Sequence, residues 1–185
     1  MGKIYLFLAD GCEEIEALTP VDICRRAGLE LVTVSINGKT MVQGSHNIPI
    51  QADILFEEAD FSDMEMLVLP GGGQGTTNLE NHVPLMALLD KTAEEGKYIS
   101  AICAAPRILG RHGLLKGEKA CCYPGFEKDL AGAEVSNEPA VVSGKFITGR
   151  GMGCSMEFAF AIVERMAGKE AAEAVRQKVA YPYGK

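Results

Sequence analysis

The chain alternates between short apolar segments and longer segments in which apolar residues recur at helical spacing. Residues 3–9 are continuously apolar, as expected for a strand that a parallel sheet buries on both faces. Residues 13–27 carry apolar positions at roughly helical spacing and end at Ala27-Gly28, which predicts a helix. A second strand is predicted over 29–36, where the turn dipeptide Asn37-Gly38 closes it.

The same alternation continues to the end of the chain. It predicts a hairpin over 41–51, a strand over 66–69, a helix over 84–96, a strand over 98–102, a helix from Pro106, a strand over 120–123, a hairpin over 140–148, and helices over 156–166 and 169–178. Strands that alternate with helices imply an α/β fold with a mainly parallel sheet covered on both faces. The length of 185 residues, without repeats or linkers, predicts a single domain over 1–185.

Composition excludes several classes of function. With 18 Lys and Arg against 25 Asp and Glu the net charge is −7, so general nucleic-acid binding is not expected. No apolar run approaches the roughly 20 residues of a membrane span, and no signal peptide is predicted. The six cysteines form no C-x-x-C motif, and the three histidines have no zinc-ligand spacing. We therefore expect reduced thiols in a cytoplasmic protein, with no metal, no cofactor and no membrane partner.

Cys103 is the most informative single residue. The apolar strand over 98–102 ends at this cysteine, small residues flank it, and Pro106 can open the next helix because its missing N–H does little harm there. A tight turn between a strand and a helix would present the thiol as a nucleophile elbow does. The partial positive charge of the helix N-terminus favours a thiolate. The alternative is a buried structural cysteine in a tight join.

Loops at the carboxyl ends of parallel strands form the sites of such sheets. Three loops fall at these ends: 10–16, 71–75 and the turn of Cys103 itself, and the loop over 149–153 is a further candidate. The glycine run 71–73 lacks the lysine and hydroxyl of a P-loop, which disfavours a phosphate cradle. It is either a flexible turn or a segment whose bare N–H groups approach a ligand. In the second case one of them, with the N–H of Ala104, could form an oxyanion hole beside Cys103.

Three glutamates open the helix predicted over 13–27. Glu13, Glu14 and Glu16 suit the dipole of a helix N-terminus, which is a sufficient reason for acids there. Glu16 lies one turn further in. If it points toward Cys103, two anions share a small space and one of them must hold a proton. A protonated Glu16 would donate a hydrogen bond to a Cys103 thiolate and could then act as an acid or base.

Several separated blocks of sequence carry a family resemblance. They are Gly11-Cys12-Glu13-Glu14-Ile15-Glu16, Pro20-Val21-Asp22, Arg25-Arg26-Ala27-Gly28, Leu69-Pro70-Gly71-Gly72, Ala101-Ile102-Cys103-Ala104-Ala105-Pro106, Thr148-Gly149-Arg150-Gly151 and Glu157-Phe158-Ala159. Almost end to end, the chain resembles the ThiJ/PfpI superfamily, on the branch of the parkinsonism-associated protein deglycase and its bacterial relatives. The resemblance implies a flavodoxin-like three-layer sandwich, of the class I glutamine amidotransferase-like kind, that forms a homodimer.

The resemblance also implies roles for individual residues. By position, Cys103 matches the reactive cysteine, Glu16 its partner glutamate, Gly72 and Ala104 the oxyanion-hole amides, and Arg26 an arginine that reaches a neighbouring subunit's site. The implied activities are conversion of methylglyoxal to lactate without glutathione, and deglycation of early dicarbonyl adducts. The alternative is a redox-sensing, protective protein with a chaperone-like role, in which the cysteine is oxidised. A thiamine-pathway role, which the superfamily name suggests, finds no support in the residues.

The chain departs from the family pattern at two positions. Protease-like members carry a histidine directly after the cysteine, where this chain has Ala104, so peptidase activity is not expected. Tyr123 stands where some members of the branch have a histidine. A tyrosine can donate a hydrogen bond or shuttle a proton, but its reference pKa of about 10 makes it a poor base. His46 and His112 are interpreted as surface or structural residues.

Overall fold

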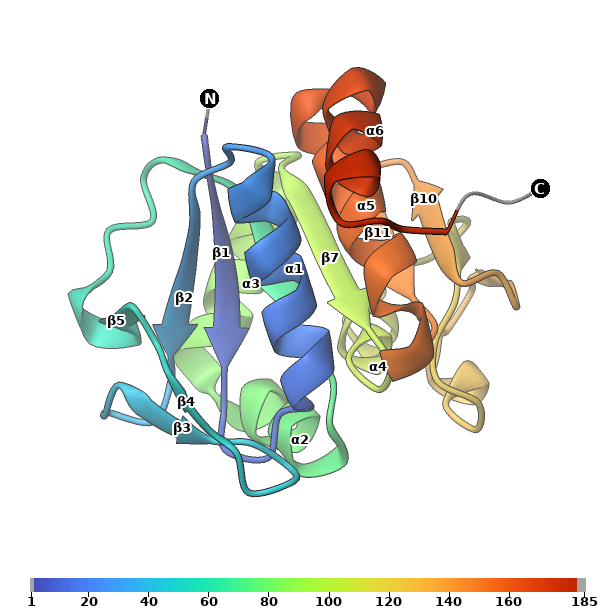
Figure 1. Ribbon diagram of the computed structural model, residues 1–185. Coiled ribbons are helices and arrows are strands. Elements are labelled where there is room, and N and C mark those ends of the chain that lie inside the picture. The colour runs from blue at the N-terminus through green and yellow to red at the C-terminus, as the bar shows by residue number, and fades with distance from the viewer. Residues whose placement is uncertain (1, 183–185) are drawn as a thin grey trace.

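A seven-stranded, mainly parallel sheet lies between two layers of helices (Figure 1). The computed structural model describes residues 2–182, so the ends of the domain predicted over 1–185 lie outside the described residues. The strand order is β10-β11-β7-β6-β1-β2-β5. The β10–β11 pair is antiparallel and the other pairs of this sheet are parallel. The predicted α/β fold with a flavodoxin-like, mainly parallel sheet is confirmed.

The elements follow one another in a mostly alternating order. The strands of the large sheet are β1 (Lys3–Leu8), β2 (Leu31–Ser35), β5 (Ile54–Leu55), β6 (Met64–Leu69), β7 (Tyr98–Ile102), β10 (Ala140–Ser143) and β11 (Phe146–Gly149). The helices are α1 (Glu14–Arg26), α2 (Gly73–Asn81), α3 (Val83–Glu94), α4 (Pro106–Arg111), α5 (Ser155–Ala167) and α6 (Lys169–Lys178). Two small sheets pair β3 (Met41–Gln43) with β4 (Pro49–Gln51) and β8 (Lys119–Ala120) with β9 (Glu134–Val135).

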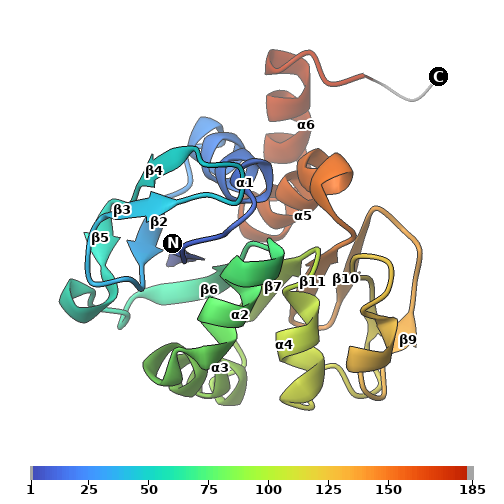
Figure 2. The same ribbon diagram turned by 90° about the horizontal axis from the view of Figure 1, so that it is seen from below.

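The central strand β1 explains why helices cover both faces of the sheet. Ile4, Leu6 and Leu8 point to one face and pack in a core with α1, α5 and α6. Tyr5 and Phe7 alternate with them and pack in the core of the other face, with α2, α3 and α4. Figure 2 shows these two helical layers on opposite sides of the strands. A continuously apolar strand is therefore required, because both of its faces are buried.

The predicted elements differ from the structure mainly where little apolar surface is buried. Helix α2 begins at Gly73, inside the segment 71–75 that the sequence analysis took as a loop. Its sequence is rich in glycine and polar residues, and its buried positions are Gly75, Thr76 and Leu79. Such a segment lacks the apolar repeat that predicts a helix. Its placement after β6 therefore depends on the tertiary structure.

Short strands account for the other differences. The strand predicted over 120–123 is only the two-residue β8, which pairs with β9 outside the large sheet. Neither β9 nor β5 was predicted, because two residues are too few to show a periodic pattern. The hairpins predicted over 41–51 and 140–148 are confirmed as β3–β4 and β10–β11. None of the helices in the described residues is long and apolar enough to cross a membrane.

Candidate active site

Cys103 lies in the turn between β7 and α4, where the sequence places it. Its φ of +65° falls in the left-handed region, which costs a non-glycine residue about 1–2 kcal/mol. The Cys103 N–H donates to the Gly149 carbonyl at 2.9 Å, and the Cys103 carbonyl accepts from the Tyr123 N–H at 2.8 Å. These two hydrogen bonds hold the thiol at the carboxyl edge of the sheet in a conformation that a free chain rarely adopts.

The side chain of Glu16 contacts Cys103 next to the backbone of Gly71. Its side chain is fully buried, and Oε2 accepts the Gly71 N–H at 3.1 Å. The carboxyl group is also hydrogen-bonded to the Cys103 thiol. Within residues 2–182, Oε1 has no N–H or O–H partner. A Cβ added at Gly71 would lie 2.6 Å from the Cys103 Cβ and would clash with the Glu16 carboxylate, so this contact requires glycine.

Two backbone N–H groups point at the sulfur of Cys103. They belong to Gly72 and Ala104, and both donate hydrogen bonds to the sulfur. Gly72 has a φ of +91° and precedes the first turn of α2. A Cβ there would lie 2.6 Å from the Glu13 nitrogen, so the backbone segments pack too closely for a side chain. The structure thus brings together at one point the thiol, the carboxyl group and both amides that the sequence analysis singled out.

Burial determines the acidity of this pair. Burial raises the pKa of Glu16 from 4.5 to about 7, although the hydrogen bonds from Cys103 and Gly71 act in the opposite direction. Burial and then the negative charge of Glu16 raise the pKa of the Cys103 thiol to about 12. This differs from the expectation that a helix N-terminus lowers the pKa of the thiol. Helix α4 has only six residues, and the partly buried sulfur lies beside the Glu16 carboxylate.

The thiol and the carboxyl group titrate together. Between a pH of about 7 and a pH of about 12 the pair holds one proton and one negative charge. When that proton is on Glu16, the sulfur is a thiolate that accepts hydrogen bonds from the carboxylic acid and from the amides of Gly72 and Ala104. The nucleophilic form therefore arises by transfer of a proton within the pair.

The loop over 149–153 joins the site through Tyr123. The aromatic ring of Tyr123 lies against Gly151, where an added Cβ would approach the ring to 3.2 Å. The side chains of Tyr123 and Met152 are about half exposed. Tyr123 therefore lies beside the site, with its backbone N–H bonded to Cys103 and its side chain about half exposed.

Arg26 lies away from the site in this chain. It is ten residues beyond Glu16 on α1, or about 15 Å along the helix axis. Its exposed guanidinium pairs with Asp22 at 2.6 Å, one helical turn earlier. Its reach into the site of a neighbouring subunit stays a prediction that follows from the family resemblance.

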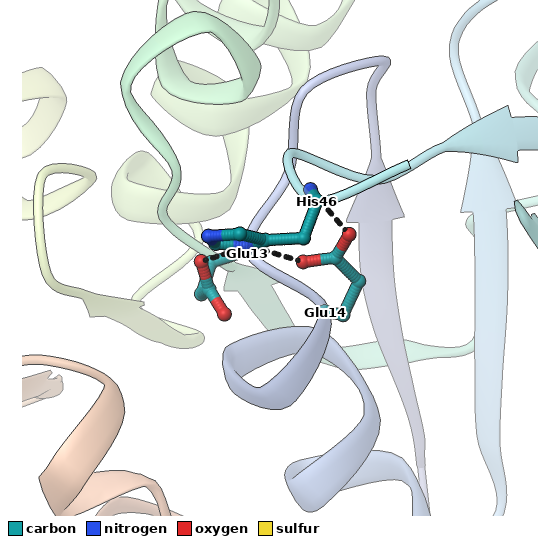
Figure 3. Close-up of side chains that lie close together, drawn as sticks. All are labelled: Glu13, Glu14 and His46. Carbon is teal, nitrogen blue, oxygen red and sulfur yellow. Dashed lines mark hydrogen bonds and ion pairs between the residues drawn. The ribbon is translucent and has the colours of Figure 1, made fainter. Parts of the chain in front are cut away.

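One group of contacts next to the site was not predicted from the sequence. Glu13 and Glu14 contact the side chain of His46, which the sequence analysis interpreted as a surface or structural residue (Figure 3). His46 comes from the turn between β3 and β4, more than 30 residues along the chain. Residue spacing could not predict this contact, because only the folded hairpin brings the turn to the start of α1.

The buried carboxyl group of Glu16 predicts a stability that depends on pH. Its pKa is higher in the folded protein than in the unfolded chain, so its contribution is full below pH 4.5 and is lost as the pH rises through about 7. Replacing Glu16 with glutamine removes this loss. From pH 5 to pH 8, the free energy of unfolding of Glu16→Gln should rise relative to wild type by about 2–3 kcal/mol.

Urea unfolding of both proteins at pH 5, 6, 7 and 8 measures this difference. Titrating groups that do not contact Glu16 are common to the two proteins and cancel in the comparison. A difference that stays constant over this range would show that Glu16 is ionised normally in the folded state.

Fold and site together define a class of protein: a parallel α/β sandwich with a cysteine in a strained turn and a buried glutamate against its thiol. The sequence model of the DJ-1/PfpI family matches residues 2–165, and the chain belongs to this family. The resemblance to the ThiJ/PfpI superfamily is thereby confirmed.

Individual relatives agree with this assignment. The chain is 37% identical over 172 residues to Protein DJ-1 homolog B of Arabidopsis thaliana, a match that covers 92% of this chain and 39% of that relative. The chain thus spans less than half of that protein. A Pyrococcus abyssi protein named a deglycase is 28% identical over 80% of this chain and 89% of its own length. The structure of oxidized Toxoplasma gondii DJ-1 has a TM-score of 0.94 and 33% identity, covering 99% of this chain and all of that one.

Proposed function

We propose that this protein uses Cys103 to attack small dicarbonyl compounds or their early adducts, as a glutathione-independent glyoxalase or deglycase. The observation that carries the proposal is the convergence of a thiol, a buried carboxyl group with an unpartnered oxygen, and two N–H donors. An aldehyde needs a nucleophile, a donor for its developing oxyanion and a group that moves protons. The name of the Pyrococcus abyssi relative, a deglycase, supports the same chemistry.

The first step forms a bond between sulfur and carbon. The Cys103 thiolate attacks the aldehyde carbon of methylglyoxal, and the electron pair of the C=O bond moves to oxygen. The amide N–H groups of Gly72 and Ala104 stabilise that oxyanion. Glu16 then gives its proton to the oxygen, which yields a neutral hemithioacetal and leaves Glu16 as a carboxylate.

The second step moves a proton between the two carbons. The Glu16 carboxylate removes the proton from the carbon bonded to sulfur, and a proton returns to the neighbouring carbon. The first carbon is oxidised to a thioester and the second is reduced to an alcohol, so no external oxidant or reductant is needed. Water then cleaves the C–S bond, which releases lactate and regenerates the thiol.

Deglycation would use the same residues. In an early adduct the aldehyde carbon already carries an amine or a thiol. The Cys103 thiolate bonds to that carbon as the C–N or C–S bond breaks, and the group leaves as the free amine or thiol with the proton of Glu16. Cys103 is partly exposed and the half-exposed Tyr123 lies beside it, which supports an open rim on this side of the site. An open rim suits a substrate attached to a larger molecule.

The direct test is the appearance of lactate in a glutathione-free solution of methylglyoxal and purified protein, followed by proton NMR. We expect lactate as the product, in proportion to the protein concentration. Methylglyoxal consumption without lactate would contradict the isomerisation and would leave only covalent trapping.

A second candidate function is redox sensing by the same thiol. A thiolate that accepts hydrogen bonds is readily oxidised to sulfenate and then sulfinate, and a protonated Glu16 could donate a hydrogen bond to the product. The Toxoplasma gondii relative is described in an oxidized form, which supports this alternative.

Mild peroxide treatment distinguishes a sensing thiol from a merely accessible one. Intact mass spectrometry should show a single product heavier by about 32 Da, which corresponds to two oxygen atoms on Cys103. Peptide mapping should place it there and not on Cys154, the other partly exposed cysteine. Oxidation spread over several of the six cysteines would count against sensing.

A further inference from the structure

Four polar side-chain atoms converge beside the start of α1. They are Oε2 of Glu13, Oε2 of Glu14, Oγ of Ser45 and Nδ1 of His46. The Ser45 Oγ lies 3.1 Å from each of the two carboxylate oxygens and 3.0 Å from the His46 Nδ1. The His46 Nδ1 lies 3.1 Å from the Glu14 oxygen and 3.4 Å from the Glu13 oxygen. Figure 3 shows the imidazole of His46 between the two glutamates.

Backbone contacts hold the two halves of this cluster together. The Ser45 N–H donates to the Cys12 carbonyl at 2.8 Å, and the His46 N–H donates to the Glu14 Oε1 at 2.7 Å. A Cβ at Gly44 would clash with the Glu14 carboxylate, so the turn also approaches α1 too closely for a side chain there. The donor atoms are therefore positioned before any ligand arrives, which is what a binding site requires.

The cluster holds more acceptors than protons. The Ser45 hydroxyl has one proton and the His46 Nδ1 has at most one, yet five contacts of 3.0–3.4 Å join the four atoms. Among residues 2–182, neither Glu13 nor Glu14 forms an ion pair with a lysine or arginine. Two carboxylates thus face a single imidazole, and a positive charge shared by all four atoms would stabilise the arrangement.

We propose that Glu13, Glu14 and His46 bind a divalent transition-metal ion, with Ser45 or water as the fourth ligand. One imidazole nitrogen and two carboxylate oxygens form a donor set suited to zinc and its neighbours. Tetrahedral bonds of about 2.0–2.2 Å separate the ligand atoms by about 3.3–3.6 Å. Five of the six separations among the four atoms are 3.0–3.4 Å, and a carboxylate oxygen of Glu13 lies within 4.8 Å of one of Glu14, so modest shifts would seat the ion.

Access and selectivity also follow from the placement of the ligands. The side chain of His46 is 70% exposed, whereas that of Glu14 is 5% exposed, so an ion can enter from solvent and meet a rigid carboxylate. The ligands are nitrogen and oxygen, and this distinguishes the cluster from any site formed by the cysteines. The proposal does not depend on the reaction at Cys103, and its test uses no measurement of turnover.

Titration of chelator-treated protein with Co²⁺, followed by absorption spectroscopy, tests the proposal. We expect one equivalent to bind with visible d–d bands and without the sulfur-to-cobalt charge-transfer absorption of a thiolate ligand. Zn²⁺ should displace the Co²⁺. His46→Gln removes an exposed ligand without disturbing the core and should weaken binding at least about tenfold. Glu13→Gln, which also replaces a partly exposed ligand, should do the same.

His112→Gln is the matched control. His112 is likewise a partly exposed histidine whose Nδ1 contacts a carboxylate, at 2.8 Å from Asp90, but only that one. Its replacement should leave Co²⁺ affinity unchanged. No binding at all, or equal binding by wild type and His46→Gln, would overturn the proposal. A charge-transfer absorption that disappears in Cys103→Ser would overturn it as well, because it would place the metal on the thiol.

Discussion

Cys103→Ser should form lactate from methylglyoxal at least about a thousandfold more slowly than wild type. A serine hydroxyl is far less acidic than a thiol, and Glu16, with a pKa of about 7, is too weak a base to ionise it. The amides of Gly72 and Ala104 would still face the substituted oxygen, so the lost activity would reflect the lost nucleophile. Initial rates of lactate formation, at equal protein concentration, measure the effect.

Cys154→Ser is the control for this experiment. Cys154 is also a partly exposed cysteine and precedes helix α5, but the charges that act on its thiol are those of Glu157 and Arg150, not that of Glu16. It should retain wild-type activity. Serine is nearly isosteric with cysteine, so both variants should show wild-type far-UV circular dichroism. Substantial turnover by Cys103→Ser would exclude the thiol as the nucleophile.

The second large effect concerns the pH dependence of Cys103 alkylation. In wild type the rate should rise with a midpoint near pH 7, because a thiolate can exist once the Glu16–Cys103 pair has lost its first proton. Glu16→Gln cannot accept the proton of the thiol, and burial alone then raises the pKa of Cys103. We expect the midpoint to rise by at least about one unit, which slows alkylation at pH 7 about tenfold.

Glu16→Leu separates proton transfer from hydrogen bonding. Glutamine can still accept the Gly71 N–H and donate to the sulfur, whereas leucine does neither, so the midpoint should rise further in Glu16→Leu. Peptide mapping after iodoacetamide treatment follows Cys103 separately from the other five cysteines. If wild-type Cys103 alkylates like a free thiol with a midpoint near 8.5, both candidate functions lose their physical basis.

Local sequence patterns predicted the turn of Cys103 well. An apolar strand, a cysteine between small residues and a proline define a short join whose geometry depends on neighbours in sequence. The contact between Cys103 and Glu16 was harder to predict, because the helix dipole already explains a glutamate in the first turns of a helix. The sequence supplied only the rule that loops at the carboxyl ends of parallel strands gather at one edge, and the strand order that brings α1 near the end of β7 comes from the structure.

The acidity of the thiol could not be predicted from the sequence. A helix start after Cys103 indicated a lowered pKa, but the exposure of the sulfur and its distance from Glu16 are properties of the fold. The contacts of His46 with Glu13 and Glu14 could not be predicted for a related reason. The β3–β4 hairpin was predicted, whereas its docking on α1 depends on packing between segments that are far apart along the chain.

The left-handed backbone conformation of Cys103 lowers the stability of the fold, although the reaction requires a cysteine at this position. Glycine or asparagine would adopt a φ of +65° with less strain, and either would relieve on the order of 1 kcal/mol. Substitution of the buried Glu16 by a neutral residue would likewise stabilise the protein at neutral pH. A variant library selected for thermal resistance alone should therefore lose both residues, and a stabilised version of this protein should be designed with these two positions held constant.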